Sequence, residues 1–326
     1  QTGEVKAMSN LDRASDEHYY EIANHSVVRM EPGSTFKTVS LMAALDDGEI
    51  KMSDTIRVYE DGWWYHGAKH KDSHPSDTVY TIRQSLAVSS NIALAKIVTD
   101  SYDGSAKKFV KKLKDMGLCD SVDYTIPGAK QALIQVPKDT VTISKMAYGY
   151  SVELSPLQIL MFYNGIANDG KMIAPLFVKE IRKKGKIIEE YESCVVNGRM
   201  CDASTLQGIR ECLHDVVWDN ELGTASVNPW GTRKAQSDLV SIAGKTGTAQ
   251  IREKGYSDSR HRMSFVGYFP EENPEYSCIC VIHAPQWPYD AGLDCGTVVR
   301  QIAEKTMAYA GEYVIKDGDF VLTVRE

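Results

Sequence analysis

The chain has 326 residues, of which 43% are hydrophobic and 25% are charged, and its formal net charge is −7. This length corresponds to about two domains of ordinary size, and the composition excludes a disordered chain, which would combine low hydrophobicity with high net charge. Because the charge balance is mildly acidic, the chain also lacks the basic surface of a general nucleic-acid-binding protein.

Three features of the sequence concern targeting, membrane insertion and cysteine chemistry. It begins with Gln1 and without a signal peptide, so we expect a fragment of a longer protein whose targeting segment has been removed. The longest uncharged stretch, 154–168, is too short for a membrane span. The seven cysteines show no zinc-binding spacing, and their odd number leaves at least one unpaired. Cys278 and Cys280 are expected to be small buried side chains on one face of a strand.

The first two thirds of the chain show mainly helical spacing of apolar residues. A region of strands ends near Met30, and residues 50–80 are expected to be strand and loop. Ser155-Pro156 is a strong helix start, because serine caps free N–H groups and proline needs none. The predicted helices lie at 35–46, 81–118 (with a separate helix at 105–116), 155–168 and 202–217.

From Ser241 onward the apolar period changes to two, which indicates strands at 241–251, 263–269 and 276–283. A helix at 297–309 follows, and Asp317-Gly318 indicates a hairpin in the tail. We therefore predict an α/β (α+β) fold, in which one antiparallel sheet built from distant segments is flanked by helices beside a mostly helical lobe. Within a single domain, 1–326, the sheet lobe is expected at about 1–50 and 220–326 and the helical lobe at about 80–215.

The first candidate chemical motif is Ser34-Thr35-Phe36-Lys37, directly after Pro32-Gly33. Ser34 would lie at a helix N-terminus, with Lys37 one turn further on the same face. A hydroxyl needs a base to become a nucleophile, and a lysine whose ammonium is destabilised by burial can serve as one. The pattern alone is weak, since Ser105-Ala106-Lys107-Lys108 repeats it. For that second copy we expect only a serine cap on a basic surface helix.

The second and third motifs are Ser89-Ser90-Asn91 and Lys245-Thr246-Gly247-Thr248. The former places polar groups inside an apolar run, where a hydroxyl could relay a proton; Ser226-Val227-Asn228 has the same form but lies in an expected loop. The latter lies in a strand pattern rather than before a helix, which argues against a phosphate-binding P-loop. Gly247 would let another segment approach closely. The ammonium of Lys245 and the hydroxyls of the two threonines suit a substrate carboxylate.

In this order, Ser-x-x-Lys, Ser-x-Asn and Lys-Thr-Gly are the signature of penicillin-binding proteins and class A β-lactamases. The chain resembles the transpeptidase domain of class B penicillin-binding proteins, which are peptidoglycan D,D-transpeptidases. The resemblance covers about 3–310, leaving the tail unaccounted for, and includes 31–37, 89–93, 148–152, 155–158, 168–170, 243–250 and 265–270.

The resemblance implies a serine β-lactamase/D,D-peptidase-like fold and an acyl-enzyme mechanism. Ser34 would attack the carbonyl of a D-Ala-D-Ala stem peptide, and Lys37 would take its proton. Ser89 would pass a proton toward the leaving group, and Asn91 would hold the substrate amide. A neighbouring stem peptide's amine would then collect the acyl group, and no metal or cofactor is implied.

The resemblance also implies a binding role for the third motif. Lys245, Thr246 and Thr248, with Gly247 between the threonines, would bind the terminal carboxylate of the stem peptide or that of a β-lactam. The backbone N–H groups of Ser34 and Thr248 would form the oxyanion hole.

Within the family, Ser-Ser-Asn and Asp72-Ser73-His74 resemble the division type more than the elongation type. Such proteins carry an N-terminal membrane helix and a pedestal domain, and neither is in this sequence. The resemblance implies a location in the cell envelope, outside the cytoplasmic membrane. The implied partners are peptidoglycan stem peptides, β-lactams and a cell-wall glycosyltransferase or division proteins.

Other interpretations of the sequence stay open. His66, His70 and His74 would share a face and could bind zinc if they lay on a helix, but the surrounding glycines and proline favour a polar loop. No Gly-x-Ser-x-Gly motif of a Ser-His-Asp hydrolase is present. A β-lactamase would need a group that activates the deacylating water, and no motif can be assigned to it. A β-lactam sensor domain would acylate its serine without transferring a peptide.

Overall fold

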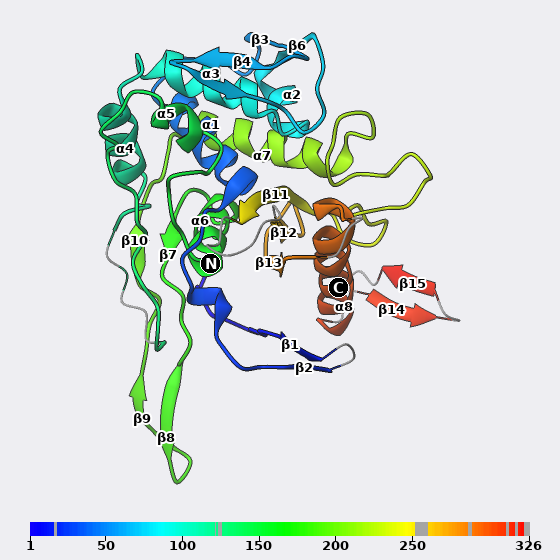
Figure 1. Cartoon of the computed structure of the whole chain (residues 1–326). Coiled ribbons are helices and arrows are strands. Elements are labelled where there is room, and N and C mark those ends of the chain that lie inside the picture. Colours follow the sequence, from blue (N-terminus) through cyan, green and yellow to red (C-terminus); the bar gives the residue numbers. More distant parts are fainter. Residues whose placement is uncertain are drawn as a thin grey trace.

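The computed structural model describes residues 1–15, 18–120, 122, 126–251, 260–285 and 289–310, together with the backbone of 313–316 and 319–322. Figure 1 shows a group of helices on one side of a sheet. Further helices pack on the sheet, and small hairpins lie around this body. The helices are α1 (Phe36–Asp46), α2 (Ile82–Ala87), α3 (Asn91–Ser101), α4 (Ala106–Asp115), α5 (Thr142–Met146), α6 (Pro156–Ala167), α7 (Ala203–Trp218) and α8 (Thr297–Tyr309). Short 3₁₀ turns occupy His25–Val27 and Gly33–Thr35, and a π-helical turn occupies Gly292–Gly296.

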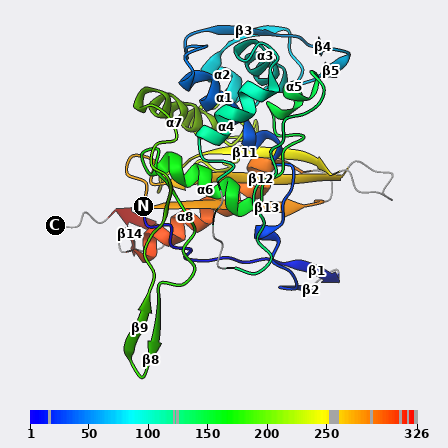
Figure 2. The ribbon, with the colours of Figure 1, turned by 90° about the vertical axis from the view of Figure 1, so that its left-hand side faces the viewer.

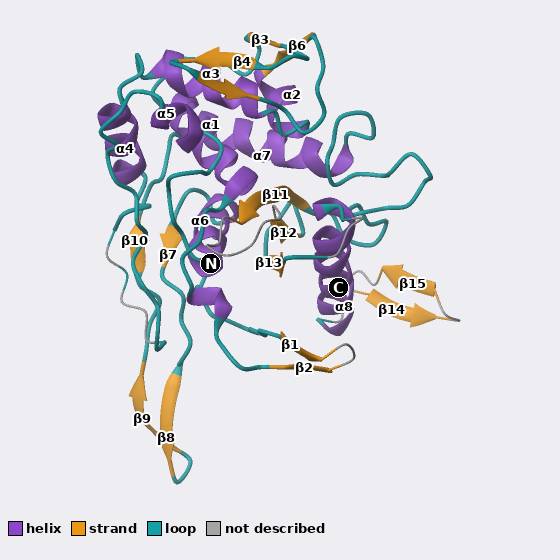
Figure 3. Ribbon diagram, viewed as in Figure 1, coloured by secondary structure: helices purple, strands orange, loops and turns teal. Residues whose placement is uncertain are grey.

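The strands form several separate small sheets (Figure 3). They are β1 (Asp12–Ser15), β2 (His18–Tyr20), β3 (Thr55–Val58), β4 (Trp63–Tyr65), β5 (Ala68–His70), β6 (Thr78–Thr81), β7 (Met172–Ile173), β8 (Glu180–Lys183), β9 (Lys186–Glu190), β10 (Val195–Asn197), β11 (Ala243–Ile251), β12 (Arg260–Phe269), β13 (Tyr276–His283), β14 (Tyr313–Lys316) and β15 (Asp319–Leu322). The largest sheet of the described residues is antiparallel, in the order β11-β12-β13, which leaves one edge of β11 unpaired.

The two faces of this sheet are covered by different helices. On β12, Val266 and Tyr268 belong to the same buried cluster as α6, whereas Met263, Phe265 and Phe269 belong to a second cluster with α8. Alternate side chains of a strand point to opposite faces, so α6 and α8 lie on opposite sides of the sheet, as Figure 1 also shows. The sheet is thus covered on both faces, with β13 less buried than β11 and β12. The predicted strands at 241–251, 263–269 and 276–283 and the helix at 297–309 are confirmed.

Helix α1 is the central helix of the helical group. Its residues from Phe36 to Ala44 are all buried, among α3, α4 and α7. A helix that is apolar nearly all round must be covered on every side, which explains this position. The lobe boundaries at 1–50, 80–215 and 220–326 stay a prediction, but α1 packs with the helical group, and α6 packs on the sheet.

The predicted helix starts at Thr81, Ser105 and Ser155 are confirmed by side-chain caps. Ser155 accepts from the Gln158 N–H and the Gln158 side chain accepts from Ser155 N–H, which makes a complete capping box with Pro156 in the first turn. Ser105 caps α4, as expected for the second Ser-x-x-Lys copy. The region 81–118 is divided into α2, α3 and α4, because Ser90 starts a new helix.

The prediction of one sheet from both ends of the chain is wrong for the described residues. β1 and β2 pair only with each other, as do β14 and β15. The residues of β1 and β2 are almost all exposed, so these strands have no apolar face to pack on the main sheet.

The sequence analysis also missed the strands between 172 and 197. Here β8 and β9 form a hairpin that extends away from the body (Figures 1 and 2). Lys184 and Gly185 at its turn both have positive φ, as a two-residue type I′ turn requires.

In the part of the chain that the structure describes, no helix has the length and apolarity of a membrane span.

Candidate active site

Ser34 and Lys37 lie where a 3₁₀ turn passes into α1. Ser34 is partly exposed at this helix start, while the Lys37 side chain is buried one turn further along. Lys37 Nζ donates to the carbonyl oxygen of Ser89 and lies 3.1 Å from Ser89 Oγ. Among the described residues, no hydrogen bond of Ser34 Oγ is found. The sequence predicted this pair as neighbours on one face, and the structure adds that the lysine amine contacts Ser89.

Ser89 brings the second and third motifs together. Its hydroxyl lies 2.9 Å from Lys245 Nζ and 3.1 Å from Lys37 Nζ, so one oxygen contacts both lysines. Lys245 Nζ also donates to the Thr246 carbonyl oxygen at 3.1 Å. A hydroxyl in this position can accept a proton from one amine while it donates to a leaving group. The structure thus places Ser89 Oγ between the two amines, and its role as a proton relay stays a prediction.

Both lysines are held in an environment that disfavours their charge. Burial lowers the pKa of Lys37 to about 7, although the carboxylate of Asp72 opposes the shift. Burial lowers the pKa of Lys245 well below its ordinary value, and the positive charge of Lys37 lowers it further. Two ammonium groups that share Ser89 destabilise each other. A neutral amine, which can act as a base, is therefore accessible near neutral pH.

The unpaired edge of β11 faces the helix start of Ser34. Gln250 N–H donates to Tyr150 Oη at 3.1 Å, which shows that this N–H points away from β12. N–H groups of residues two apart on a strand point to the same side, so Thr248 N–H also points outward. The carbonyl of Thr248 lies on the same side, because a Cβ built on Gly33 would meet its oxygen at 2.5 Å. The Thr248 N–H thus points to the side on which Gly33 and Ser34 lie.

Glycines allow the two segments of the site to come this close. A Cβ on Gly247 would lie 2.2 Å from Ser264 Oγ and 2.7 Å from Thr35 Cγ2. A Cβ on Gly149 would lie 2.2 Å from the carbonyl oxygen of Gly33. The expected close approach at Gly247 is therefore confirmed, and Gly149 adds a second close approach that the sequence analysis did not identify.

The remaining predicted residues line the strand edge and the helix start of α3. Thr246 is buried, and its Oγ1 lies 2.7 Å from Thr224 Oγ1. Thr248 is exposed, and its hydroxyl donates to Met263 Sδ at 3.5 Å. Asn91 Nδ2 donates to the carbonyl oxygen of Lys71 at 2.8 Å, so its amide is engaged with the loop after β5 rather than with the lysines.

Several buried residues around the site were not predicted as functional. Tyr163 of α6 donates from its hydroxyl to the Thr35 carbonyl oxygen at 2.8 Å and lies 2.7 Å from Thr38 Oγ1, which fixes the start of α1. A buried tyrosine hydroxyl needs a partner, but the sequence does not reveal which one. Asp72, in the loop after β5, accepts hydrogen bonds from the start of α3. Its only signal in the sequence was the family resemblance of 72–74.

The histidines of the predicted polar loop do not share a helix face. His66 lies in the turn between β4 and β5, and His70 ends β5. Both ring nitrogens of His70 have partners, with Nδ1 2.9 Å from Tyr148 Oη and Nε2 3.0 Å from Ser144 Oγ. Burial lowers the pKa of His70 to about 4. The ring therefore joins β5 to α5 as a neutral group.

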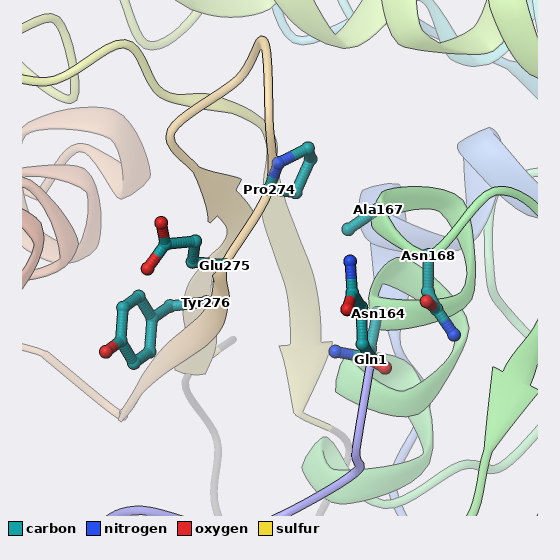
Figure 4. A pocket seen from close by; sticks show the side chains of 7 residues that line it. All are labelled: Gln1, Asn164, Ala167, Asn168, Pro274, Glu275 and Tyr276. Carbon is teal, nitrogen blue, oxygen red and sulfur yellow. The ribbon is translucent and has the colours of Figure 1, made fainter.

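A small surface pocket lies elsewhere, between α6 and the loop before β13 (Figure 4). It is lined by Gln1, Asn164, Ala167, Asn168, Pro274, Glu275 and Tyr276. Because none of the three motifs contributes to it, this pocket is not part of the candidate active site.

Comparison with known proteins gives matches over nearly the whole chain. The family described as penicillin binding protein transpeptidase domain matches residues 1–307. A probable peptidoglycan D,D-transpeptidase PenA of Neisseria flavescens is 26% identical over 324 residues, covering 95% of this chain and 74% of that protein. Three further curated relatives are 25–27% identical, and the chain spans only 48–54% of their length.

Solved structures with the same fold include two penicillin-binding proteins 3. The transpeptidase domain from Burkholderia pseudomallei superposes with a TM-score of 0.76 at 23% identity, covering 95% of this chain and 86% of that one. The protein from Mycobacterium tuberculosis, complexed with aztreonam, gives a TM-score of 0.76 at 24% identity, with 89% and 65% covered.

Proposed function

Because the chain belongs to the penicillin-binding protein transpeptidase domain family, we propose that it is the catalytic domain of a class B peptidoglycan D,D-transpeptidase. In this proposal, Ser34 forms an acyl-enzyme with a stem peptide ending in D-Ala-D-Ala. The observation that carries the assignment is the contact of Ser89 Oγ with two buried lysines from two other motifs. Structural neighbours under 25% identical support the fold, while the site residues are assigned from this geometry and from the motifs.

Acylation begins with attack of Ser34 Oγ on the carbonyl carbon of the penultimate D-Ala. The proton of the hydroxyl passes to the neutral amine of Lys37, whose lowered pKa of about 7 suits a base at neutral pH. The negative charge that develops on the carbonyl oxygen is stabilised by the N–H groups of Ser34 and Thr248. The C–N bond then breaks, and Ser89 Oγ passes a proton to the amine of the departing D-Ala.

Binding of the donor peptide is assigned to the edge of β11. Its terminal carboxylate contacts the Thr248 hydroxyl and the Thr246–Lys245 group, where Thr224 holds the Thr246 hydroxyl in place at 2.7 Å. Asn91 binds the peptide amide by releasing Lys71. The amine of a second stem peptide attacks the Ser34 ester, forms the cross-link and restores the serine.

The same geometry accounts for inhibition by β-lactams. The β-lactam carbonyl takes the position of the scissile amide, and ring opening leaves the acyl group on Ser34. Because the leaving amine stays attached to the inhibitor, it obstructs the acceptor, and deacylation is slow. We retain the β-lactamase and the β-lactam sensor of the same fold as alternatives, since each also acylates the serine.

The wider role follows from the relatives rather than from the site. Cell-wall synthesis places the protein in the cell envelope, and we propose the extracytoplasmic face of the cytoplasmic membrane. The division type is favoured by Ser-Ser-Asn and by residues 72–74. A cell-wall glycosyltransferase or division proteins are the proposed partners.

The test separates the three acyl-serine functions. One sample of the chain is incubated with benzylpenicillin and followed by intact mass for hours. A separate sample, without penicillin, is incubated with a pentapeptide ending in D-Ala-D-Ala and an amine-bearing stem peptide. A stable adduct and a cross-linked dimer peptide are expected. Rapid loss of the adduct with turnover of penicillin would identify a β-lactamase, and a stable adduct without peptide transfer would favour the sensor.

A further inference from the structure

Asp72 binds the start of the helix that carries the second motif. Its carboxylate accepts hydrogen bonds from Ser90 Oγ at 2.7 Å, Asn91 N at 2.5 Å and Ile92 N at 3.0 Å. Ser90 is already the N-cap of α3, since its Oγ accepts from Ala93 N. A carboxylate at a helix N-terminus satisfies free N–H groups and interacts favourably with the helix dipole. The start of α3 is therefore capped by two side chains, one of them from a distant loop.

The segment held in this way contains a strained residue. Ser89, directly before Ser90, has φ of 58°, in the left-handed region that a residue with a Cβ rarely adopts. Such a conformation persists only where the surroundings enforce it. On one side the loop is fixed by the hydrogen bonds Ser89 N to Leu86 O and Ser90 N to Ser85 O. On the other side, the Asp72 carboxylate holds Ser90, Asn91 and Ile92.

The position of Ser89 decides whether its hydroxyl contacts the lysines. Ser89 Oγ lies 3.1 Å from Lys37 Nζ and 2.9 Å from Lys245 Nζ. A displacement of the loop by about 1 Å would therefore break one of these contacts. Among the described residues, the carboxylate of Asp72 raises the pKa of Lys37, and the charge of Lys37 lowers the pKa of Lys245 on β11. Asp72 is thus the negative charge beside a pair of buried amines, and it favours the protonated form of Lys37.

We propose that Asp72 is a positioning residue of the active site, which fixes the Ser89–Asn91 loop against the two lysines and favours the positive charge on Lys37. This inference rests on the proposed function, because it concerns the acylation of Ser34. It goes beyond the three motifs, in which Asp72 takes no part.

Two variants separate the hydrogen bonds from the charge. Asp72→Asn keeps an acceptor for the two N–H groups but removes the charge, and Asp72→Ala removes both. The matched controls are Asp139→Asn and Asp139→Ala, because Asp139 makes the same kind of contacts at the start of α5, to Val141 N at 3.0 Å, Thr142 N at 2.7 Å and Thr142 Oγ1 at 2.9 Å. The second-order rate constant of benzylpenicillin acylation is measured from pH 5 to 9, per active site titrated with penicillin.

The expected result differs between the variants. Asp72→Ala lowers the rate constant by about 10- to 100-fold at pH 8, since Ser89 is no longer held. Asp72→Asn has a smaller effect at pH 8 but moves the acid limb of the profile to lower pH, because loss of the negative neighbour lets Lys37 lose its proton more easily. The Asp139 variants leave both the rate constant and the limb unchanged.

Three outcomes would contradict the inference. A merely structural Asp72 would lower the melting temperature, as we expect of the Asp139 variants, with an unchanged pH profile and rate per titrated site. If Asp72→Ala does not fold, an unshifted acid limb in Asp72→Asn, which is nearly isosteric, overturns the inference. If the parent chain is not acylated at all, the proposed function fails as well. If the parent chain is acylated and the Asp72 variants behave like it, only the role of Asp72 is excluded.

Discussion

The two copies of Ser-x-x-Lys show how differently one pattern behaves in two places. Ser34 and Ser105 both lie at helix starts, each with a lysine one turn further along. Lys37 is buried between α1, β11 and the Ser89 loop, and its pKa is lowered to about 7. Lys108 is exposed, and its hydrogen bond with Asp103 raises its pKa. The first lysine can be a base near neutral pH, whereas the second stays charged.

The cause of the difference is outside the tetrapeptide. Lys37 Nζ contacts Ser89, and that serine contacts Lys245 from β11. Ser105 Oγ instead accepts from the Lys108 backbone N–H, at 3.4 Å, so it serves the helix. The spacing of serine and lysine is therefore not sufficient for a nucleophile and its base. The lysine must also be buried and contact a group from another part of the chain.

The largest expected effect is on covalent labelling. Ser34→Ala should abolish the benzylpenicillin adduct seen by intact mass, because the nucleophilic oxygen is gone, while Ser105→Ala should label like the parent. Full labelling of Ser34→Ala, or its loss in Ser105→Ala, would reverse our assignment of the two copies.

Removing the base should be nearly as severe. Lys37→Ala is expected to slow acylation by about 10²- to 10⁴-fold, the usual contribution of a general base. Lys108→Ala is the matched control, and stopped-flow or quenched-flow acylation rates are the measurement. Equal losses in both variants would show that lysine burial does not distinguish the copies.

The pH dependence should follow the buried lysine. Protonation of Lys37 removes the base, so the acylation rate should rise with pH up to its pKa of about 7 and level off above it. Below that pKa the rate should fall by about tenfold per pH unit, since the neutral fraction does. A profile without an acid limb between pH 5 and 8 would exclude Lys37 as the group that titrates.

A smaller effect is expected at Lys245. Lys245→Ala should weaken acylation by about 10- to 100-fold without stopping it, because a hydrogen bond from the amine to the charged carboxylate of the substrate is lost while Ser34 and Lys37 remain. Rate constants with benzylpenicillin test this. Complete inactivation at unchanged melting temperature would assign Lys245 to the proton transfer itself.

The smallest expected effect is on the free energy of unfolding, when Ser105 of the second Ser-x-x-Lys copy is replaced. Ser105→Ala should cost about 0.5–1 kcal/mol of unfolding free energy, since it removes a long N-cap hydrogen bond. Denaturant unfolding measures the change. A larger loss would mean that α4 depends on this cap more than its packing indicates.

Local patterns predicted much of the fold and of the site. The helix at 297–309, the strand at 276–283 and the helix start at Ser155 follow from residues within a few positions of each other. The three motifs were found in the same way. The pairing of β1 with β2, by contrast, was mispredicted, because alternation does not say which partner a strand finds.

The contacts between motifs depended on distant parts of the chain. Ser89 is 52 positions from Lys37 and 156 from Lys245, and Asp72 reaches 20 positions to Ile92. Tyr163 supports Thr35 from 128 positions away. Contacts between residues this far apart leave no local pattern in the sequence, such as an apolar period or a capping motif.

The sequence by itself determined which residues could react, because the order and spacing of Ser-x-x-Lys, Ser-Ser-Asn and Lys-Thr-Gly are local and specific. Only the tertiary structure decided that Lys37 rather than Lys108 loses its charge easily, and that β11 presents an unpaired edge beside Ser34. The physical reason is that a side chain's identity is fixed by one position, whereas its desolvation and its partners are supplied by elements that the fold brings together.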